Sequence, residues 1–181
     1  HVAIDGEDVV SMGEERLARM RLEKIGFIFQ TFNLLTNFTA HENIEAPMVL
    51  LGRRSKAERR ARAAELLASV GLSDRAEHFP SELSGGQQQR VAIARALAND
   101  PSIIIGDEMT GDLDSATGFE IMALVRELNQ TKGTTVVYVT HDPRMADYAD
   151  YTIHLLDGML VDRVEGKGNR AVEPALNGGT R

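Results

Sequence analysis

The stretch Leu83-Ser84-Gly85-Gly86-Gln87, continued by Gln88-Gln89-Arg90, is the most specific part of the sequence. It opens a helix that we expect over residues 84–99, with a serine followed directly by two glycines. The free N–H groups at a helix start, together with the helix dipole, favour a bound phosphate. Glycines let a ligand approach the backbone closely, whereas an ordinary serine cap does not need two residues that lower helix stability. The stretch therefore favours a phosphate-binding helix start over a simple capped helix.

Two apolar strands end in polar side chains that are candidates for catalysis. Ile103-Ile104-Ile105 has the pattern of a strand buried on both faces of a parallel sheet, and it runs through Gly106 into Asp107 and Glu108. The β-branched segment 134–140 runs into His141. Taken alone, the two carboxylates could simply meet solvent at a strand end, and a lone histidine is more often structural or exposed than catalytic.

The order of the expected elements predicts the fold class. Strands alternate with helices, which indicates an α/β fold with a mainly parallel sheet. We expect strands or hairpins at residues 2–10, 25–29, 103–105, 134–140 and 152–164. Asp114 or Ser115 can cap a helix that runs to about residue 130.

The block 31–95 has no strong strand pattern and is predicted to form a helical lobe inserted between two sheet-forming parts. Residues 55–70 are expected to be a helix, because Ser55 and Glu58 form a capping box and Gly71 suits the C-terminal end. Residues 31–53 are expected to be mixed, with Pro47 and Gly52 as breakers.

The composition is that of an ordinary globular domain. Of the 181 residues, 43% are hydrophobic and 26% are charged, which allows a sizeable core. The net charge of −7 argues against a dedicated nucleic-acid-binding protein, which would usually be basic. There is no cysteine, so disulfides and cysteine metal sites are excluded. No apolar run approaches the roughly 18–20 residues that span a bilayer.

Residues 83–87 resemble the signature sequence of ABC ATPases, and further motifs of that family occur in the family's order. Residues 103–108 resemble a Walker B element, and residues 109–114 resemble the D-loop region, with Met109 where the family usually has proline. Thr140-His141-Asp142 resembles the switch histidine segment, and Gln30 resembles the Q-loop glutamine. The resemblance implies a P-loop NTPase-like α/β fold, with a three-layer core, a mainly parallel sheet and an inserted helical subdomain.

The resemblance also implies the ligands and the residues that would hold them. ATP and Mg²⁺ would be the cofactors, in sites shared by a head-to-tail dimer of nucleotide-binding subunits. The implied catalytic residues are Glu108 as general base, His141 at the γ-phosphate and Gln30 near the attacking water. The implied nucleotide-binding residues are Ser84, Gly85, Gly86, Gln87 and Asp114. The implied Mg²⁺ ligands are Asp107 and Gln30.

The stretch from Phe32-Asn33-Leu34-Leu35 to Thr39-Ala40-His41-Glu42-Asn43 resembles the ABC ATPases that serve lipoprotein-release and macrolide-export systems, although Thr36 stands where that group usually has proline. This implies a membrane permease subunit or a fused transmembrane domain as partner, with no nucleic-acid partner. It also implies a peripheral location at the cytoplasmic face of the inner membrane. The apolar side chains of this stretch are expected to divide between lobe core and contact surface; they are Phe32, Leu34, Leu35 and Phe38.

The sequence contains no G-x-x-x-x-G-K-S/T motif. The resemblance covers residues 1–165, and the P-loop of the family precedes the hairpin at residues 2–10, so we expect an N-terminally truncated cassette. The expected parts are 1–30 (core up to the Q-loop), 31–95 (helical subdomain), 96–165 (core with Walker B, D-loop and switch histidine) and 166–181 (flexible tail).

Three functions stay open on the sequence. The first is the ATPase subunit of a transporter, and the second is a non-catalytic module that supplies only its signature segment to a partner. The third is a soluble ABC ATPase outside transport. The missing motif favours the second for the chain taken literally, and the intact Walker B, D-loop and switch segments favour the first.

Overall fold

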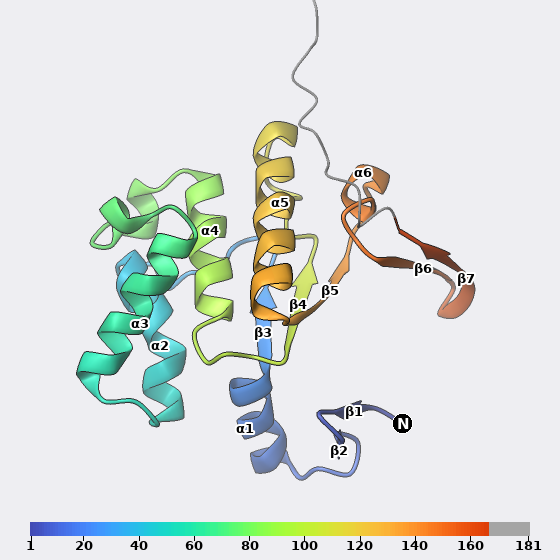
Figure 1. Ribbon diagram of the computed structural model, residues 1–181, viewed down its shortest axis with the longest axis horizontal. Coiled ribbons are helices and arrows are strands. Elements are labelled where there is room, and N and C mark those ends of the chain that lie inside the picture. The colour runs from blue at the N-terminus through green and yellow to red at the C-terminus, as the bar shows by residue number, and fades with distance from the viewer. Residues whose placement is uncertain (167–181) are drawn as a thin grey trace, which may run out of the picture. The chain divides into compact units, whose positions relative to one another are not determined.

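The computed structural model describes residues 1–166 and divides the chain into two compact units, His1–Val139 and Thr140–Arg181 (Figure 1). Nearly all of the tail predicted from residue 166 onward lies outside the described residues. The four predicted parts of the chain stay a prediction. The two units are described separately below.

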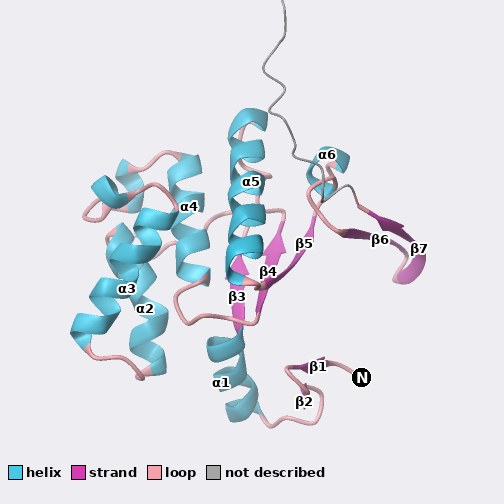
Figure 2. Ribbon diagram, in the orientation of Figure 1, coloured by secondary structure: helices cyan, strands magenta, loops and turns pink. Residues whose placement is uncertain are grey.

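The first unit contains a short hairpin, a three-stranded sheet and most of the helices (Figure 2). Its strands are β1 (Ala3–Ile4), β2 (Glu7–Asp8), β3 (Ile25–Ile28), β4 (Ile103–Asp107) and β5 (Thr135–Val139). Its helices are α1 (Glu14–Lys24), α2 (Ala40–Leu51), α3 (Lys56–Ser69), α4 (Gly85–Ala96) and α5 (Ser115–Lys132), with short 3-10 helices η1 (Ser73–Arg75) and η2 (Pro80–Glu82).

The sheet is parallel in the order β3-β4-β5, which confirms the α/β prediction for this part of the chain. Its register places Ile28 opposite Gly106, and Asp107 opposite Val139. The crossover from β3 to β4 passes through α2, α3 and α4, so the described residues between 31 and 95 are helical or irregular, as predicted.

One face of the sheet is packed and the other is exposed. Helix α4 lies so close to β3 that a Cβ on Gly26 would be 2.5 Å from the carbonyl oxygen of Ala96. On the opposite face the stacked rings of Phe27 and Phe29 are each 36% exposed, and Val139 of β5 is 62% exposed. The sheet therefore presents apolar side chains on one face within the described residues.

Helix α2 corrects the prediction that residues 31–53 are mixed. Thr39 caps it and forms a capping box with Glu42, and this pattern was visible in the sequence but overlooked. Pro47 lies inside the helix rather than ending it. Gly52, with φ +71°, ends the helix, because this left-handed conformation suits a residue without Cβ.

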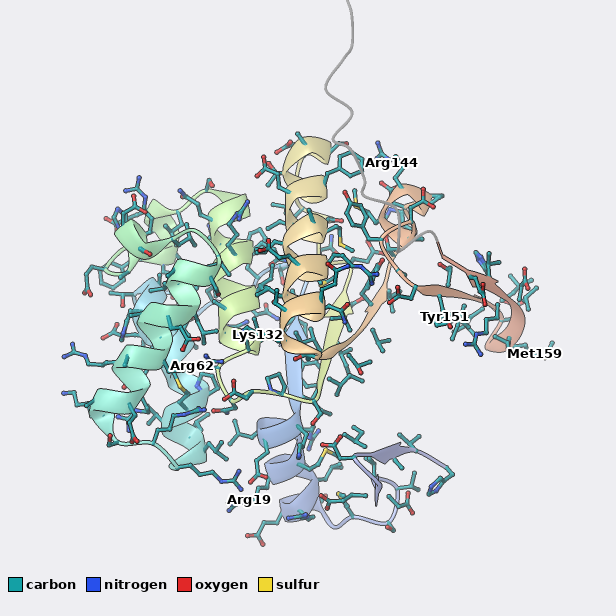
Figure 3. All side chains as sticks on the ribbon, viewed as in Figure 1. Arg19, Arg62, Lys132, Arg144, Tyr151 and Met159 are labelled. Atoms are coloured by element: carbon teal, nitrogen blue, oxygen red, sulfur yellow. The ribbon has the colours of Figure 1, made fainter. Side chains whose placement is uncertain are left out.

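Helix α3 agrees with the prediction, and two arginines, Arg62 in the helix and Arg54 just before it, connect it to the loop before β4. Ser55 and Glu58 form the predicted capping box. Arg54 and Arg62, the latter labelled in Figure 3, both pair with the carboxylate of Asp100, at 2.6 and 2.5 Å. The start of α3 is thus held to the loop before β4 by ion pairs within the chain.

The second unit contains α6 (Pro143–Ala146) and an antiparallel hairpin of β6 (Tyr151–Leu156) and β7 (Met159–Glu165), which confirms the predicted hairpin. Its turn places Asp157 and Gly158 at positive φ, as an Asp-Gly turn requires. Among residues 1–166 no helix is both long and apolar enough to cross a membrane.

Candidate functional site

The start of α4 carries the predicted phosphate-binding residues. The Ser84 hydroxyl accepts a hydrogen bond from the N–H of Gln87 at 3.3 Å, and the Gln87 side chain accepts one from the N–H of Ser84 at 2.9 Å. Ser84 is exposed. The N–H groups of Gly85 and Gly86 belong to the first turn, where helix geometry provides no acceptor. An exposed hydroxyl and two N–H groups can therefore donate to an anion at this end of the helix.

The two glycines of this turn also have a packing role, which depends on residues far away in the sequence. A Cβ on Gly86 would lie 2.6 Å from Cγ2 of Thr117 on α5, and a Cβ on Gly85 would lie 3.3 Å from Cδ2 of Leu113. The absence of side chains lets α4 approach α5 and the loop before it. The glycines alone therefore do not argue for a ligand, and the case for phosphate rests on the donors.

We expect Gly86→Ala to destabilise the chain by about 1–3 kcal/mol, the usual cost of overpacking. Thr117 cannot rotate away freely, because it is β-branched and its hydroxyl donates to Asp114 at 2.6 Å. Thr117→Ser removes Cγ2 and keeps that hydroxyl, so in the double variant most of the loss should be recovered. Urea unfolding of the single and double variants measures this. An equal effect of Gly86→Ala in both backgrounds would show that Thr117 is not the obstacle.

Glu108 lies in a tight turn directly after β4, beside the exposed Asp107. Its φ of +42° is unusual for a residue with a side chain, and such strain clusters at functional sites. The turn is fixed on both sides: the N–H of Glu108 donates to the carbonyl of Val139 at 3.1 Å, and the N–H of Gly111 donates to the carbonyl of Glu108 at 2.8 Å. The backbone thus holds Glu108 in one conformation at the end of the sheet.

Met109 is buried, and its sulfur occupies the space that a Cβ on Gly106 would need. The residue that replaces the family's usual proline therefore fills the space under the end of β4.

Gln30 follows β3 and contacts the loop after Glu108. Its side-chain amide donates to the carboxylate of Asp112 at 2.8 Å, and a Cβ on Gly111 would be 2.9 Å from the same amide nitrogen. The structure therefore brings Gln30 to the D-loop segment that begins at Met109. Its predicted contacts with water and Mg²⁺ stay predictions.

Asp114 caps α5, as the sequence predicted. One carboxylate oxygen accepts from the N–H groups of Ala116 and Thr117, and the other accepts from the Thr117 hydroxyl. The hydrogen bonds from the side chain and backbone N–H of Thr117 lower the pKa of the Asp114 carboxyl. This capping is sufficient reason for an aspartate here, and its role in nucleotide binding stays a prediction.

His141 belongs to the second unit and is exposed. Its neighbour Asp142 caps α6, and the side-chain hydrogen bond from Arg144 lowers the pKa of the Asp142 carboxyl. The predicted role of His141 at the γ-phosphate stays a prediction.

The metal prediction rests on few ligands. Within residues 1–166 no group of three or more His, Cys, Asp or Glu side chains is placed to hold a metal ion. Mg²⁺, however, commonly binds through one or two carboxylates together with water and substrate phosphates. The exposed carboxylate of Asp107 suits that mode.

Comparisons with known proteins identify the family. The family model described as "ABC transporter" matches residues 1–111. An uncharacterized ABC transporter ATP-binding protein of Thermotoga maritima is 53% identical over 171 residues, which are 94% of this chain and 70% of the relative. The macrolide export ATP-binding/permease protein MacB of Escherichia coli K12 is 48% identical over 158 residues, which are 87% of this chain but 24% of that protein. The chain thus spans about a quarter of the ATP-binding/permease relative.

Solved structures agree with the sequence relatives. The ATP-binding cassette MJ0796, solved as a dimer in a post-hydrolysis state with ADP and Pi, matches with a TM-score of 0.79 and 47% identity, over 90% of this chain and 71% of that one. A second dimeric structure of the same cassette matches with a TM-score of 0.75. The predicted P-loop NTPase-like fold is confirmed, and the chain belongs to the ABC transporter ATP-binding family.

Proposed function

We propose that this chain is part of an ATP-hydrolysing subunit that powers a membrane transporter of the export or lipoprotein-release type. The observation that carries the proposal is the exposed helix start at Ser84, Gly85 and Gly86, together with the strained turn that presents Glu108. The helix start is suited to bind a phosphate, and the turn presents a carboxylate that can act as a general base. Two such subunits would meet head to tail, so that each site takes its helix start from one subunit and its base from the other.

The roles of the side chains follow from their chemistry. The Ser84 hydroxyl and the first N–H groups of α4 would donate to the γ-phosphate held by the partner. The Glu108 carboxylate would accept a proton from the water that attacks the γ-phosphorus, and Gln30 would orient that water. Asp107 would hold Mg²⁺, which neutralises charge on the phosphates when it is bound. One relative supports the pairing, since the cassette MJ0796 was solved as a dimer in both matched structures.

The membrane partner would contact an apolar surface around the start of α2. Leu35 and Phe38 are 48% and 40% exposed, and Phe79 is 41% exposed. The N–H of Ala40 donates to the carbonyl of His78 at 2.8 Å, which brings the segment of Phe79 against the start of α2, next to Phe38. Relatives named ATP-binding/permease proteins carry both functions in one chain. The subunit would then lie at the cytoplasmic face of the inner membrane.

The test uses the full-length protein that contains these residues, purified from its own membranes in mild detergent. We expect it to co-purify with a permease, and Phe38→Glu to abolish the association because it places a charge in the apolar contact. Leu50→Glu is the matched control, since Leu50 is 76% exposed near the other end of the same helix. Wild-type protein recovered without any membrane protein would favour a soluble ABC ATPase and contradict the proposal.

A non-catalytic half-site module is the second candidate. Such a module would offer only its helix start to a complete partner. Calorimetry measures how tightly the 181-residue chain alone binds MgATP. Both candidates predict a Kd of about 1 mM or weaker for this chain alone. The two candidates are distinguished by joining the chain to a P-loop-bearing N-terminal segment of an ABC ATPase; the product is called the extended protein below. Only the catalytic candidate predicts that the extended protein hydrolyses ATP.

A further inference from the structure

Gln89 of α4 has contacts that no motif in the sequence explains. Its side chain is fully buried, with 0% exposure. The side-chain amide nitrogen donates to the backbone carbonyl of Met109 and, at 3.3 Å, to the backbone carbonyl of Phe29. These acceptors are 20 and 60 residues away along the chain. One amide group therefore joins the helix that begins at Gly85 to the ends of two strands.

The two acceptors flank the two residues proposed to handle the attacking water. Met109 follows Glu108 directly, and Phe29 directly precedes Gln30. Any movement of α4 would act on both backbones through the same side chain. The Met109 carbonyl belongs to the central peptide group of the turn from Glu108 to Gly111, which is closed by the hydrogen bond from the N–H of Gly111 to the carbonyl of Glu108.

A second residue of α4 fixes the other side of Gln30. Arg95 donates to the carbonyls of Phe32 and Asn33, both of which have positive φ. Gln89 holds the residue before Gln30, and Arg95 holds the segment after it. The segment that carries Gln30 is thus fastened to α4 at both ends.

Stability alone is a poor reason for this glutamine. The side-chain oxygen of Gln89 is buried and has no hydrogen-bond partner among residues 1–166. A buried polar atom without a partner costs about 1–3 kcal/mol, which offsets much of what the two hydrogen bonds contribute. A core position selected only for packing would favour an apolar residue.

We propose that Gln89 is a positioning residue that sets the backbone at Glu108 and Gln30 and couples both to the helix start at Ser84. The effect of Gln89 on catalysis rests on the proposed function. Its effect on the backbone at Glu108 and Gln30 does not, because it follows from the hydrogen bonds of Gln89 alone. When an anion binds the first turn of α4, the helix and the turn at Glu108 would respond together. Gln89 would thereby link occupancy of one half-site to the geometry of the base in the other.

The structural part is tested by amide hydrogen exchange on the 181-residue chain carrying Gln89→Met, which keeps the length and removes the donor. We expect the amides of Glu108 and Gly111 to lose protection by about tenfold or more, because their turn loses its anchor. The amides of Leu66 and Leu67 in α3 should keep theirs. Gln88→Met is the matched control: among residues 1–166 its amide donates to the carbonyl of Leu83, just before the same helix, so the turn at Glu108 should be unaffected.

Two results would overturn the structural part. Unchanged protection at Glu108 and Gly111 would show that Gln89 does not hold the turn. An equal loss in α3 and in the turn would show that Gln89 supports only global stability. If Gln89→Met does not fold, Gln89→Glu replaces it, because a buried neutral carboxyl still provides one donor. The amides of Glu108 and Gly111 should then lose more protection than those of Leu66 and Leu67 in α3, and a loss in α3 as large as in the turn would contradict the proposal.

The catalytic part is tested in the extended protein. We expect Gln89→Met to lower kcat by about 10-fold to 100-fold, as small misplacements of catalytic groups do, with KM changed less than about twofold. Unchanged kcat would overturn this part. The proposed function fails separately: if Glu108→Gln leaves hydrolysis intact, Glu108 is not the base, whatever the exchange data show.

Discussion

Glu108→Gln in the extended protein is expected to lower the rate of ATP hydrolysis by about 10² to 10⁴, the range that general-base catalysis contributes. The amide keeps the size of the carboxylate but cannot accept a proton from the attacking water. The turn should be retained, because the N–H groups of Glu108 and Gly111 both donate to backbone carbonyls and these hydrogen bonds remain available to glutamine. Steady-state hydrolysis and MgATP binding are measured together, and binding should be retained.

Glu127→Gln is the control for Glu108→Gln. Glu127 is exposed on α5, and its neutralisation changes the net charge by the same amount. Its rate should equal that of the wild type. Full hydrolysis by Glu108→Gln would remove Glu108 from the mechanism, and the strained turn would then need another explanation.

Asn43→Leu is expected to destabilise the chain by about 2–4 kcal/mol, because the four backbone groups that Asn43 bonds each lose a buried or part-buried hydrogen bond. Asn43 has 0% exposure. Its side-chain oxygen accepts from the N–H of Leu35 at 2.8 Å, and its amide donates to the carbonyls of Leu35, Phe38 and Thr39 at 3.1, 3.1 and 3.0 Å. Leucine has a similar volume but satisfies none of these groups.

Urea unfolding measures the effect of Asn43→Leu, with Asn37→Leu as its matched control. Asn37 lies in the same loop but is exposed, so its replacement should change stability by less than about 0.5 kcal/mol. A loss below about 1 kcal/mol for Asn43→Leu would mean that water replaces the lost contacts. The apolar surface at Leu35 and Phe38 would then not depend on Asn43 for its shape.

Local signals in the sequence predicted most of the fold. The capping box of Ser55 and Glu58 predicted α3, because short-range hydrogen bonds decide where this helix begins. The apolar run at 103–105 predicted β4, because burial favours a strand there. Helix α2 was missed because Pro47 was taken as a breaker, although the capping box of Thr39 and Glu42 was present. In this lobe the capping and the burial of the helix outweigh the cost of one proline.

The candidate site was predicted less completely. The order of the motifs placed Glu108, Gln30 and Ser84 at element ends, and the structure agrees. Contacts between distant residues could not be predicted: Gln89 lies in the stretch quoted first, but nothing in that stretch says which backbone carbonyls its side chain reaches. The role of Gln89 depends on two carbonyls on other elements, and the need for Gly86 depends on Thr117.

The most direct test of the account is complementation between two inactive variants of the extended protein, Glu108→Gln and Ser84→Arg. In a head-to-tail dimer each mixed pair contains one complete site, with Ser84 from one subunit and Glu108 from the other. An equal mixture, with mixed dimers confirmed by native mass spectrometry, should therefore recover about a quarter of the wild-type rate of hydrolysis. No recovery in such mixed dimers would mean that both elements serve a site within one chain, and the account of a shared site would be wrong.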